Sequence, residues 1–446
     1  ATHKTLYSFE HDQYENIDSL ALTSEEPRMD PGNPVLTGGP SEEPFDGKIC
    51  YTSSLERAGA GYGLWYQREY PQGNFVREVA FSADGFEWHK ETITGDQLFG
   101  KIGNSFNVYW DGQRYLAPLT ALGTEVSAES EYRALLPEDP PDERRRVLAQ
   151  EAIEKSGRAG VVTFVGVATS HDGKTWSLPQ PTPRLPMKLE TPWIYHFQGR
   201  YIMNAQTNGK WFDPPHPSSR IVTFFTSEDL LSWETIPECM TNRAHESILG
   251  QTHVGILPIK QVDDRMLLGL GGRFDDGAEL TDQHFEVTLL YSYDGLHWSP
   301  VVPDHERRNW IRRGRRGEWD FGGVAGIGMI ENGDRAAVYF NGTSIGNACH
   351  TQPTYDPGSC QVGRALLLRD RFAALQPIVG WKTLDARAAR TTVRGSLTTT
   401  PLTISKDRSL SLNVDIPRDD AATVTVEALR PDGSVMATAR LNTGGV

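Results

Sequence analysis

The chain lacks the features that mark several large classes of protein. Its four cysteines have no metal-site spacing. No run approaches the roughly 20 apolar residues that a helix needs to cross a bilayer. The net charge of −14 leaves no basic excess for general nucleic-acid binding. We therefore expect no cysteine-ligated metal, no membrane and no nucleic-acid partner.

The cysteines are interpreted as thiols rather than as a disulfide framework. Cys50, Cys239 and Cys349 stand in or near strand-like runs, where a buried thiol packs as a small apolar side chain. Cys349 and Cys360 bracket a loop with proline and glycine and would pair in an oxidising compartment. No signal peptide is visible at Ala1. This favours the cytoplasm, although removal of an export signal leaves the same picture.

Four heptapeptides repeat one pattern. They are SADGFEW from Ser82, SHDGKTW from Ser170, SEDLLSW from Ser227 and SYDGLHW from Ser292. Each follows a stretch rich in β-branched and aromatic residues. The phrase Ser-x-Asp-Gly-x-x-Trp is thus typical of a strand, a tight turn and a second strand that begins with a buried aromatic. The repeat unit is predicted to be a hairpin in a small antiparallel sheet.

The spacing of the repeats predicts a β-propeller. The intervals from Trp176 to Trp233 and from Trp233 to Trp298 are each roughly 60 residues, which suits a blade of several strands. The interval from Trp88 to Trp176 is longer because residues 125–160 read as a helical insertion, with Pro-Pro-Asp before strong helix formers. With 43 Gly, 28 Pro and 11 Trp among 446 residues, we expect one large domain with an aromatic-rich core.

The strand-like runs divide the chain into three parts within an all-β fold class. Residues 28–380 are predicted to form a five-bladed propeller with the helical insertion in blade 2. Its fifth blade has lost the Ser-x-Asp-Gly phrase. Residues 381–446 contain three strand-like runs and a Pro-Asp-Gly turn, which predict a small β appendage. Residues 1–27 are expected to pack beside it on the propeller edge.

Polar side chains at the starts of the innermost strands of a propeller meet around its central funnel. Three carboxylates fall at these positions: Asp46 in blade 1, Glu190 in blade 3 and Asp320 in blade 5. Glycoside cleavage requires such a convergence. One carboxyl group protonates the leaving oxygen while another attacks the anomeric carbon or activates water. The sequence therefore predicts a glycoside-cleaving site in the funnel.

Further side chains around the funnel are expected to bind substrate. His253 stands alone on its strand, and a lone histidine more often binds substrate or lies in the core than ligates a metal. Arg273 follows Gly-Gly at a strand end, where it either holds a substrate group or pairs with Asp275 or Asp276. Tryptophans offer stacking faces to sugars, although an aromatic in a propeller is more often core. The predicted substrate-binding residues are Asn104, His253, Arg273, Trp65, Trp193 and Trp319. No metal or cofactor is predicted.

The residues around Glu190 resemble a motif of known enzymes. Glu190-Thr191-Pro192, followed by an apolar strand and the Gly-Arg-Tyr of FQGRYIM, resembles the third-blade Glu-x-Pro of glycoside hydrolase families 32 and 43, where that glutamate is the general acid. The Ser-x-Asp…Trp phrases resemble third-strand turns of those families. Residues 28–34 (RMDPGNP) echo the blade-1 Asn-Asp-Pro-Asn-Gly of family 32, but lie well before the inner strand. The blade-2 Arg-Asp-Pro of family 32 has no match here, because residues 103–105 read Gly-Asn-Ser.

The resemblance implies a glycoside hydrolase that is exo-acting on furanosyl or related sugars of an oligosaccharide or glycoside. Glu190 is then the general acid, Asp46 the nucleophile or general base, and Asp320 an auxiliary carboxylate. Family 32 retains and family 43 inverts the anomeric configuration, so the stereochemistry stays open. The second half of the chain also resembles a large group of uncharacterised bacterial propeller proteins. The likeness lies in its Trp319-Asp320, a Tyr-Phe-Asn-Gly strand end and a Ser-Leu-Thr-Thr-x-Pro-Leu run.

Two other functions stay open. A non-catalytic carbohydrate-binding propeller follows if Asp46 and Asp320 point away from the funnel. A glycoside phosphorylase binds phosphate through basic side chains in place of the catalytic base. The arginine-rich run 307–316 leads directly into Asp320, so its guanidinium groups would select an anionic sugar or a phosphate. That run is also typical of a solvated loop or of a subunit contact in a homo-oligomer. A six-bladed sialidase is disfavoured, because its repeat has one more residue between Asp and Gly.

Overall fold

A computed structural model of the chain describes fourteen segments. These are residues 6–37, 48–70, 74–93, 106–123, 161–178, 189–207, 221–236, 251–275, 283–302, 309–346, 360–377, 394–402, 412–414 and 423–442. The described segments are strands, turns and one short 3₁₀ turn, η1 (His11–Gln13), which confirms the predicted all-β propeller class. The predicted helical insertion at 125–160 lies outside them. None of the described segments contains a helix long and apolar enough to span a membrane.

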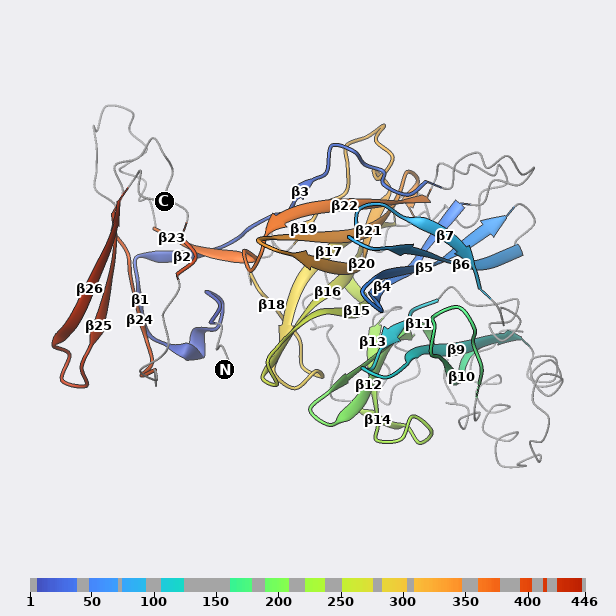
Figure 1. Ribbon diagram of the computed structural model, residues 1–446, viewed down its shortest axis with the longest axis horizontal. Helices are drawn as coiled ribbons and strands as arrows, with labels where there is room; N and C mark the ends of the chain where they lie inside the picture. Colours follow the sequence, from blue (N-terminus) through green and yellow to red (C-terminus); the bar gives the residue numbers. More distant parts are fainter. Residues whose placement is uncertain are drawn as a thin grey trace.

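The propeller strands group into antiparallel units that follow one another along the chain (Figure 1). Unit 1 consists of β4 (Lys48–Ala58), β5 (Gly61–Tyr70), β6 (Asn74–Ser82) and β7 (His89–Thr92). Unit 2 consists of β8 (Tyr109–Trp110), β9 (Tyr115–Gly123) and β10 (Val161–Ser170). Unit 3 consists of β11 (Glu190–Phe197), β12 (Arg200–Thr207), β13 (Ile221–Ser227) and β14 (Glu234–Ile236).

Units 4 and 5 are joined by a single parallel pairing between Phe285 and Gly323. Unit 4 consists of β15 (Gln251–Val262), β16 (Met266–Asp275) and β17 (His284–Ser292), with β18 (Ser299–Pro300) and β19 (Asn309–Ile311) along the edge of β17. Unit 5 consists of β20 (Gly323–Asn332), β21 (Arg335–Thr343) and β22 (Cys360–Leu368), and its fourth strand is β3 (Arg28–Met29) from the N-terminal end.

The core lies between the units. Successive side chains of a strand point to opposite faces of its sheet. Leu64 and Tyr66 on β5 therefore pack against unit 5, whereas Trp65 between them packs against unit 2. Further buried clusters separate units 2 and 3, units 3 and 4, and units 4 and 5. Each unit is thus covered on both faces, and the contact of unit 1 with unit 5 closes the ring.

Each repeated phrase is a turn held by its own serine and aspartate. In the first copy, the Ser82 hydroxyl accepts the Gly85 amide at 2.8 Å, and Asp84 accepts the amides of Phe86 and Glu87. These two amides hold the pKa of Asp84 below its usual range. The same serine and aspartate bonds recur in the copies that begin at 170, 227 and 292.

Three of these turns dock on the unit that precedes them in the ring. The Gly173 carbonyl of unit 2 accepts the indole N–H of Trp65 in unit 1 at 2.7 Å. The Gly295 carbonyl of unit 4 accepts the hydroxyl of Tyr195 in unit 3 at 2.6 Å. The turn of unit 1 meets unit 5, where Tyr339 donates its hydroxyl to the Gly85 carbonyl. The phrases therefore build contacts between units, and we assign them no catalytic role.

The run 28–34 closes the ring from outside. β3 pairs with β22, and the Asp30 carboxylate accepts two hydrogen bonds from Arg364, at 2.8 and 2.6 Å. The Asn33 amide donates to the Arg364 carbonyl, and the Arg364 amide donates back to Asn33 Oδ1, each at 2.8 Å. The run that echoes the blade-1 motif of family 32 thus serves here as a seam between the N-terminal segment and unit 5.

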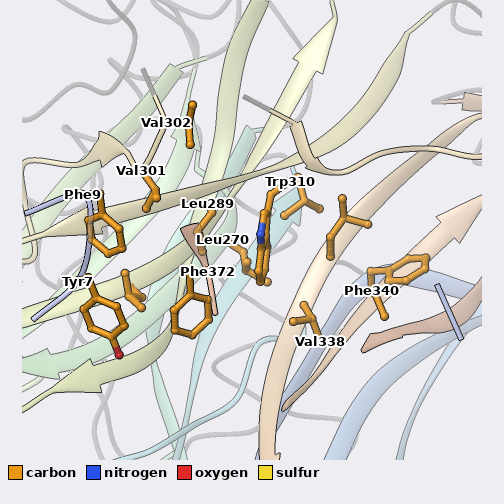
Figure 2. Packing of buried hydrophobic residues seen from close by; sticks show 14 of the residues in the cluster. Tyr7, Phe9, Leu270, Leu289, Val301, Val302, Trp310, Val338, Phe340 and Phe372 are labelled. Carbon is orange, nitrogen blue, oxygen red and sulfur yellow. The ribbon is translucent and has the colours of Figure 1, made fainter. Parts of the chain in front are cut away.

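The two ends of the chain pair with each other beside the propeller. β1 (Tyr14–Asp18) pairs with β24 (Ser396–Thr399), and β2 (Leu20–Ser24) pairs with β23 (Ala373–Pro377). Figure 1 shows the hairpin of β25 (Thr423–Leu429) and β26 (Val435–Asn442) at the far end. Tyr7 and Phe9 enter the cluster between units 4 and 5, as Figure 2 shows. Cys360 is fully buried, and Cys349 lies outside the described residues.

Candidate functional site

Glu190 opens the first strand of unit 3 at a bulge. Gln198 and Gly199 form the turn between β11 and β12, both with positive φ, and Phe197 pairs with Arg200 across it. The register then shifts between Glu190 and Trp193, so that Gln206 stands opposite Glu190. Bulges often re-aim a side chain beside an active site. Gln206 Nε2 donates to Glu190 Oε2 at 2.7 Å.

The backbone after Glu190 is held from unit 2. Asn107 is 2% exposed and precedes β8, and its Nδ2 donates to the Pro192 carbonyl at 2.8 Å. Leu189 on the other side of Glu190 is fully buried in the cluster between units 2 and 3. Thr191 between them has a φ of 50°, a left-handed conformation that a β-branched residue rarely adopts. The segment 189–192 therefore has a defined path along the contact between the two units.

Asp320 precedes the first strand of unit 5 and is 6% exposed. Burial, followed by the charge of Glu318, raises the pKa of the Asp320 carboxyl above its ordinary value. A methyl group added to Gly314 would overlap Asp320 Oδ1 and lie 2.6 Å from Glu318 Oε2, so both carboxyl groups flank this glycine. The Gly314 amide donates to the Asp320 carbonyl at 3.3 Å. The arginine-rich loop thus contacts the residue that we predicted as the auxiliary carboxylate.

Arg273 belongs to a polar network at the edge of unit 4. Its backbone position on β16 stands opposite His253 of β15 on one side and opposite Glu286 of β17 on the other. Its Nη1 donates to Asn309 Oδ1 at 2.8 Å, and the Asn309 amide donates to Glu286. Arg313 Nε lies 4.0 Å from Glu286 Oε1. The side chain of Arg273 therefore contacts Asn309 within this network.

The tryptophans differ in their surroundings. Trp65 has no exposed surface, so its prediction as a sugar-stacking residue was wrong and the ring belongs to the core between units 1 and 2. Trp193 is half-buried on β11, and its indole lies over Gly255 of unit 4, since a methyl group there would be 3.3 Å from Nε1. Trp319 is also half-buried and stacks on Phe340 with ring centroids 5.9 Å apart.

The described residues include part of the predicted set. Glu190 opens β11, His253 is the third residue of β15, and Asp320 lies three residues before β20 begins, so these positions share the starting ends of first strands. Asp46, Asn104 and the side chain of His253 lie outside the described residues. Among the described residues, no group of three or more histidine, cysteine, aspartate or glutamate side chains is arranged to hold a metal ion.

Gln206 is the contact of Glu190 that sequence reasoning missed. The hairpin turn at Gln198-Gly199 is visible in the sequence and fixes the register near it. That register alone would place Thr207 opposite Glu190. Only the bulge brings Gln206 there, and nothing in the sequence marks the bulge.

The fold resembles that of glycoside-active enzymes of known structure. A glycosyl hydrolase from Bacteroides ovatus matches with a TM-score of 0.50 and 13% identity, over 80% of this chain and 97% of that chain. A protein described with the GH130 family of mannoside phosphorylases, which contains hydrolases that target β-1,2-mannosidic linkages in Candida mannan, has a TM-score of 0.46 and 13% identity, over 84% and 99% of the two chains. A thermostable family-43 glycoside hydrolase has a TM-score of 0.44 and 11% identity, over 78% and 99%.

No family model and no curated protein matches the sequence. The likeness to solved structures is therefore one of fold, and the glycosyl hydrolase from Bacteroides ovatus carries it. This fold is the all-β propeller that the repeat spacing predicts.

Proposed function

We propose that the protein is a glycoside hydrolase that acts on an oligosaccharide or glycoside, exo-acting on furanosyl or related sugars. The observation that carries the proposal is the placement of Glu190. It opens the first strand of its unit at a bulge, and its carboxyl group is held at 2.7 Å by Gln206. Glu190 protonates the leaving oxygen, and Asp46 is the nucleophile or general base in this proposal.

Asp320 acts as an auxiliary carboxylate in this proposal. Because burial raises its pKa, it keeps a proton to higher pH than an exposed aspartate does. A carboxyl group can hydrogen-bond a sugar hydroxyl in either protonation state. Trp193, half-buried between units 3 and 4, is the tryptophan that we propose for contact with a sugar face.

A glycoside phosphorylase is the second candidate, and the loop at 312–318 favours it. Arg315 and Arg316 are exposed, whereas Arg312 pairs with Glu26 at 2.9 Å. The loop reaches Asp320 through the Gly314 amide. Exposed guanidinium groups bind phosphate well, so a phosphate nucleophile would be held there in place of water.

The test of the hydrolase is turnover of a panel of aryl and natural furanosides and pyranosides by the wild type, by Glu190→Gln and by Glu234→Gln. Glu234 is exposed on β14 and gives the same substitution away from the site. We expect Glu190→Gln to lose about a hundredfold or more on the natural glycosides, whose leaving groups need a proton, because general acid catalysis contributes 10²–10⁴-fold. Glu234→Gln should match the wild type. Equal turnover by Glu190→Gln would remove Glu190 from the mechanism.

Two further readouts separate the alternatives. NMR of the first released anomer distinguishes retention from inversion. Omission of inorganic phosphate distinguishes hydrolysis from phosphorolysis, since a phosphorylase stops without it and yields a sugar phosphate when it is present. If nothing on the panel turns over in either buffer while the panel sugars still bind, the carbohydrate-binding propeller replaces both enzymes.

A further inference from the structure

We infer that Gln206 is a positioning residue for the acid, and that Asn107 fixes the backbone from which the acid projects. The inference rests on the proposed function, because it assigns Glu190 the proton transfer. It adds two residues from neighbouring units that determine where the transferred proton stands. Neither is proposed to exchange a proton with the substrate.

The first step is the contact between Gln206 and Glu190. Gln206 is 8% exposed and stands on β12, which is hydrogen-bonded on both sides by β11 and β13. A side-chain amide on such a strand has little freedom to move. Its donation at 2.7 Å to Glu190 Oε2 fixes one carboxyl oxygen and therefore the plane of the carboxyl group. The other carboxyl oxygen of Glu190 then keeps one orientation, because the side chain does not sample several rotamers.

The backbone after Glu190 is also held in place. Glu190 is followed by Thr191 at a φ of 50°, and such a conformation persists only where its surroundings enforce it. The bond from Asn107 to the Pro192 carbonyl supplies that constraint, and Asn107 is almost completely buried. Because Asn107 belongs to unit 2, the direction of Glu190 depends on the contact between units 2 and 3. Both anchors are amides, which keep the same charge across the working pH range.

The rate of proton transfer depends on where the carboxyl group of the acid lies. A general acid has to lie within about 2.6–3.2 Å of the atom that it protonates. A misplacement of about 1 Å can cost a hundredfold in rate. Loss of the Gln206 contact should therefore lower the rate of proton transfer while the sugar still binds.

The experiment uses Gln206→Met, which keeps the length of the side chain and removes the amide. Gln113→Met is the matched control, since Gln113 is exposed in the turn between β8 and β9. Each enzyme is assayed on two glycosides of the same sugar. One has a dinitrophenolate leaving group, which departs without a proton, and the other has an alkoxide leaving group, which needs one.

We expect Gln206→Met to lose about 10- to 100-fold in kcat/KM on the alkyl glycoside. On the dinitrophenyl glycoside the loss in kcat/KM should be threefold or less, because this ratio reports on departure of the leaving group and not on the later hydrolysis of a covalent intermediate, in which a retaining enzyme uses the same residue as a base. A residue that only supports the fold would lower both rates by the same factor, and that result would overturn the inference. Asn107→Ser should show the same selectivity if the backbone anchor acts through Glu190.

Glu190→Gln, tested in the same assays, distinguishes failure of the proposed acid from failure of the proposed positioning role. If Glu190→Gln is impaired on the alkyl glycoside and Gln206→Met is not, the proposed acid stands and the positioning role fails. If Glu190→Gln is active on both, the acid assignment fails and the inference fails with it. A crystal structure of Gln206→Met gives a readout that needs no turnover. A Glu190 carboxyl unmoved from its wild-type orientation would also contradict the positioning role.

Discussion

At the scale of single residues, the fourth position of each repeated phrase decides how a turn meets its neighbour. Gly295 has a φ of 77°, and a methyl group on it would lie 2.6 Å from Ile202 Cδ1 in unit 3. In the phrase of unit 3 the same position is Leu230, with a φ of 67°, buried in the cluster with unit 2. The position thus accepts a side chain only where the neighbouring unit leaves room.

Gly295→Ala is expected to lower the free energy of unfolding by about 3 kcal/mol. About 1–2 kcal/mol comes from the left-handed backbone, and overpacking against Ile202 adds about 1–3 kcal/mol. Gly199→Ala is the matched control, because Gly199 has a φ of 81° and no atom within 4 Å of the added methyl group. Chemical denaturation of both variants measures the difference. Equal losses would show that packing against unit 3 contributes nothing.

The carboxyl group of Glu56 on β4 is expected to make the stability of the protein depend on pH. Burial raises the pKa of its carboxyl group to about 8, against a smaller lowering by the Trp110 amide. The native state therefore keeps a proton that the unfolded chain releases above its ordinary pKa. Stability is full at low pH and is lost as the pH rises toward about 8. We expect Glu56→Gln to match the wild type near pH 5 and to have the higher melting temperature near pH 9.

The melting temperatures of both proteins are measured across that pH range. Glu15→Gln, on the exposed strand β1, controls for the change in net charge. If Glu56→Gln loses as much stability at alkaline pH as the wild type does, another ionisable group causes that loss.

At the scale of elements, hairpins were the predictable part of the fold. The Ser-x-Asp-Gly-x-x-Trp phrase contains all the atoms that hold its own turn, so its structure follows from local sequence. The strands before all four phrases therefore fell where the sequence placed them, and a strand follows three of the phrases, while Ser177 after the second phrase makes an isolated bridge with Thr169. β3 was not predictable in this way. Its partner β22 is more than three hundred residues away in sequence, and a strand of two residues is too short to show the alternation that identifies a strand.

The candidate site was predictable only in part, for a related reason. Glu190 could be proposed from the sequence because its motif is local, whereas Gln206 stands opposite it through a bulge that no pattern marks. Trp65 was misplaced because both faces of β5 are covered. Leu64 and Tyr66 are as fully buried as Trp65. Because both faces of the strand are buried, the sequence shows no alternation that would tell an accessible side chain from a core side chain.

At the scale of the whole molecule, the ring is closed by residues from three parts of the chain. Arg364 of β22 pairs with Asp30 of the N-terminal segment and donates to the Tyr339 hydroxyl at 3.3 Å. Its guanidinium group also lies 4.3 Å from the ring centroid of Phe86, in the turn of unit 1. One side chain thus joins the last unit, the first unit and the strand that precedes them both.

Asp30→Ala is therefore expected to destabilise the entire propeller. The side chains of Asp30 and Arg364 are only 12% and 11% exposed, and removal of one partner from such a pair costs about 3–5 kcal/mol, because the other charge stays without compensation. Asp334→Ala is the control. Asp334 is exposed in the turn between β20 and β21 of the same unit, so its loss should change stability by less than about 0.5 kcal/mol.

The denaturation midpoint and the rate of unfolding in denaturant together measure the effect. If the seam closes the ring, Asp30→Ala shifts the midpoint in a single transition, since every unit depends on its two neighbours for its core. A midpoint equal to that of Asp334→Ala would mean that the apolar contact between units 1 and 5 closes the ring alone. Loss of β3 without any change in the main transition would instead show that the N-terminal strand is an independent layer on a ring already complete.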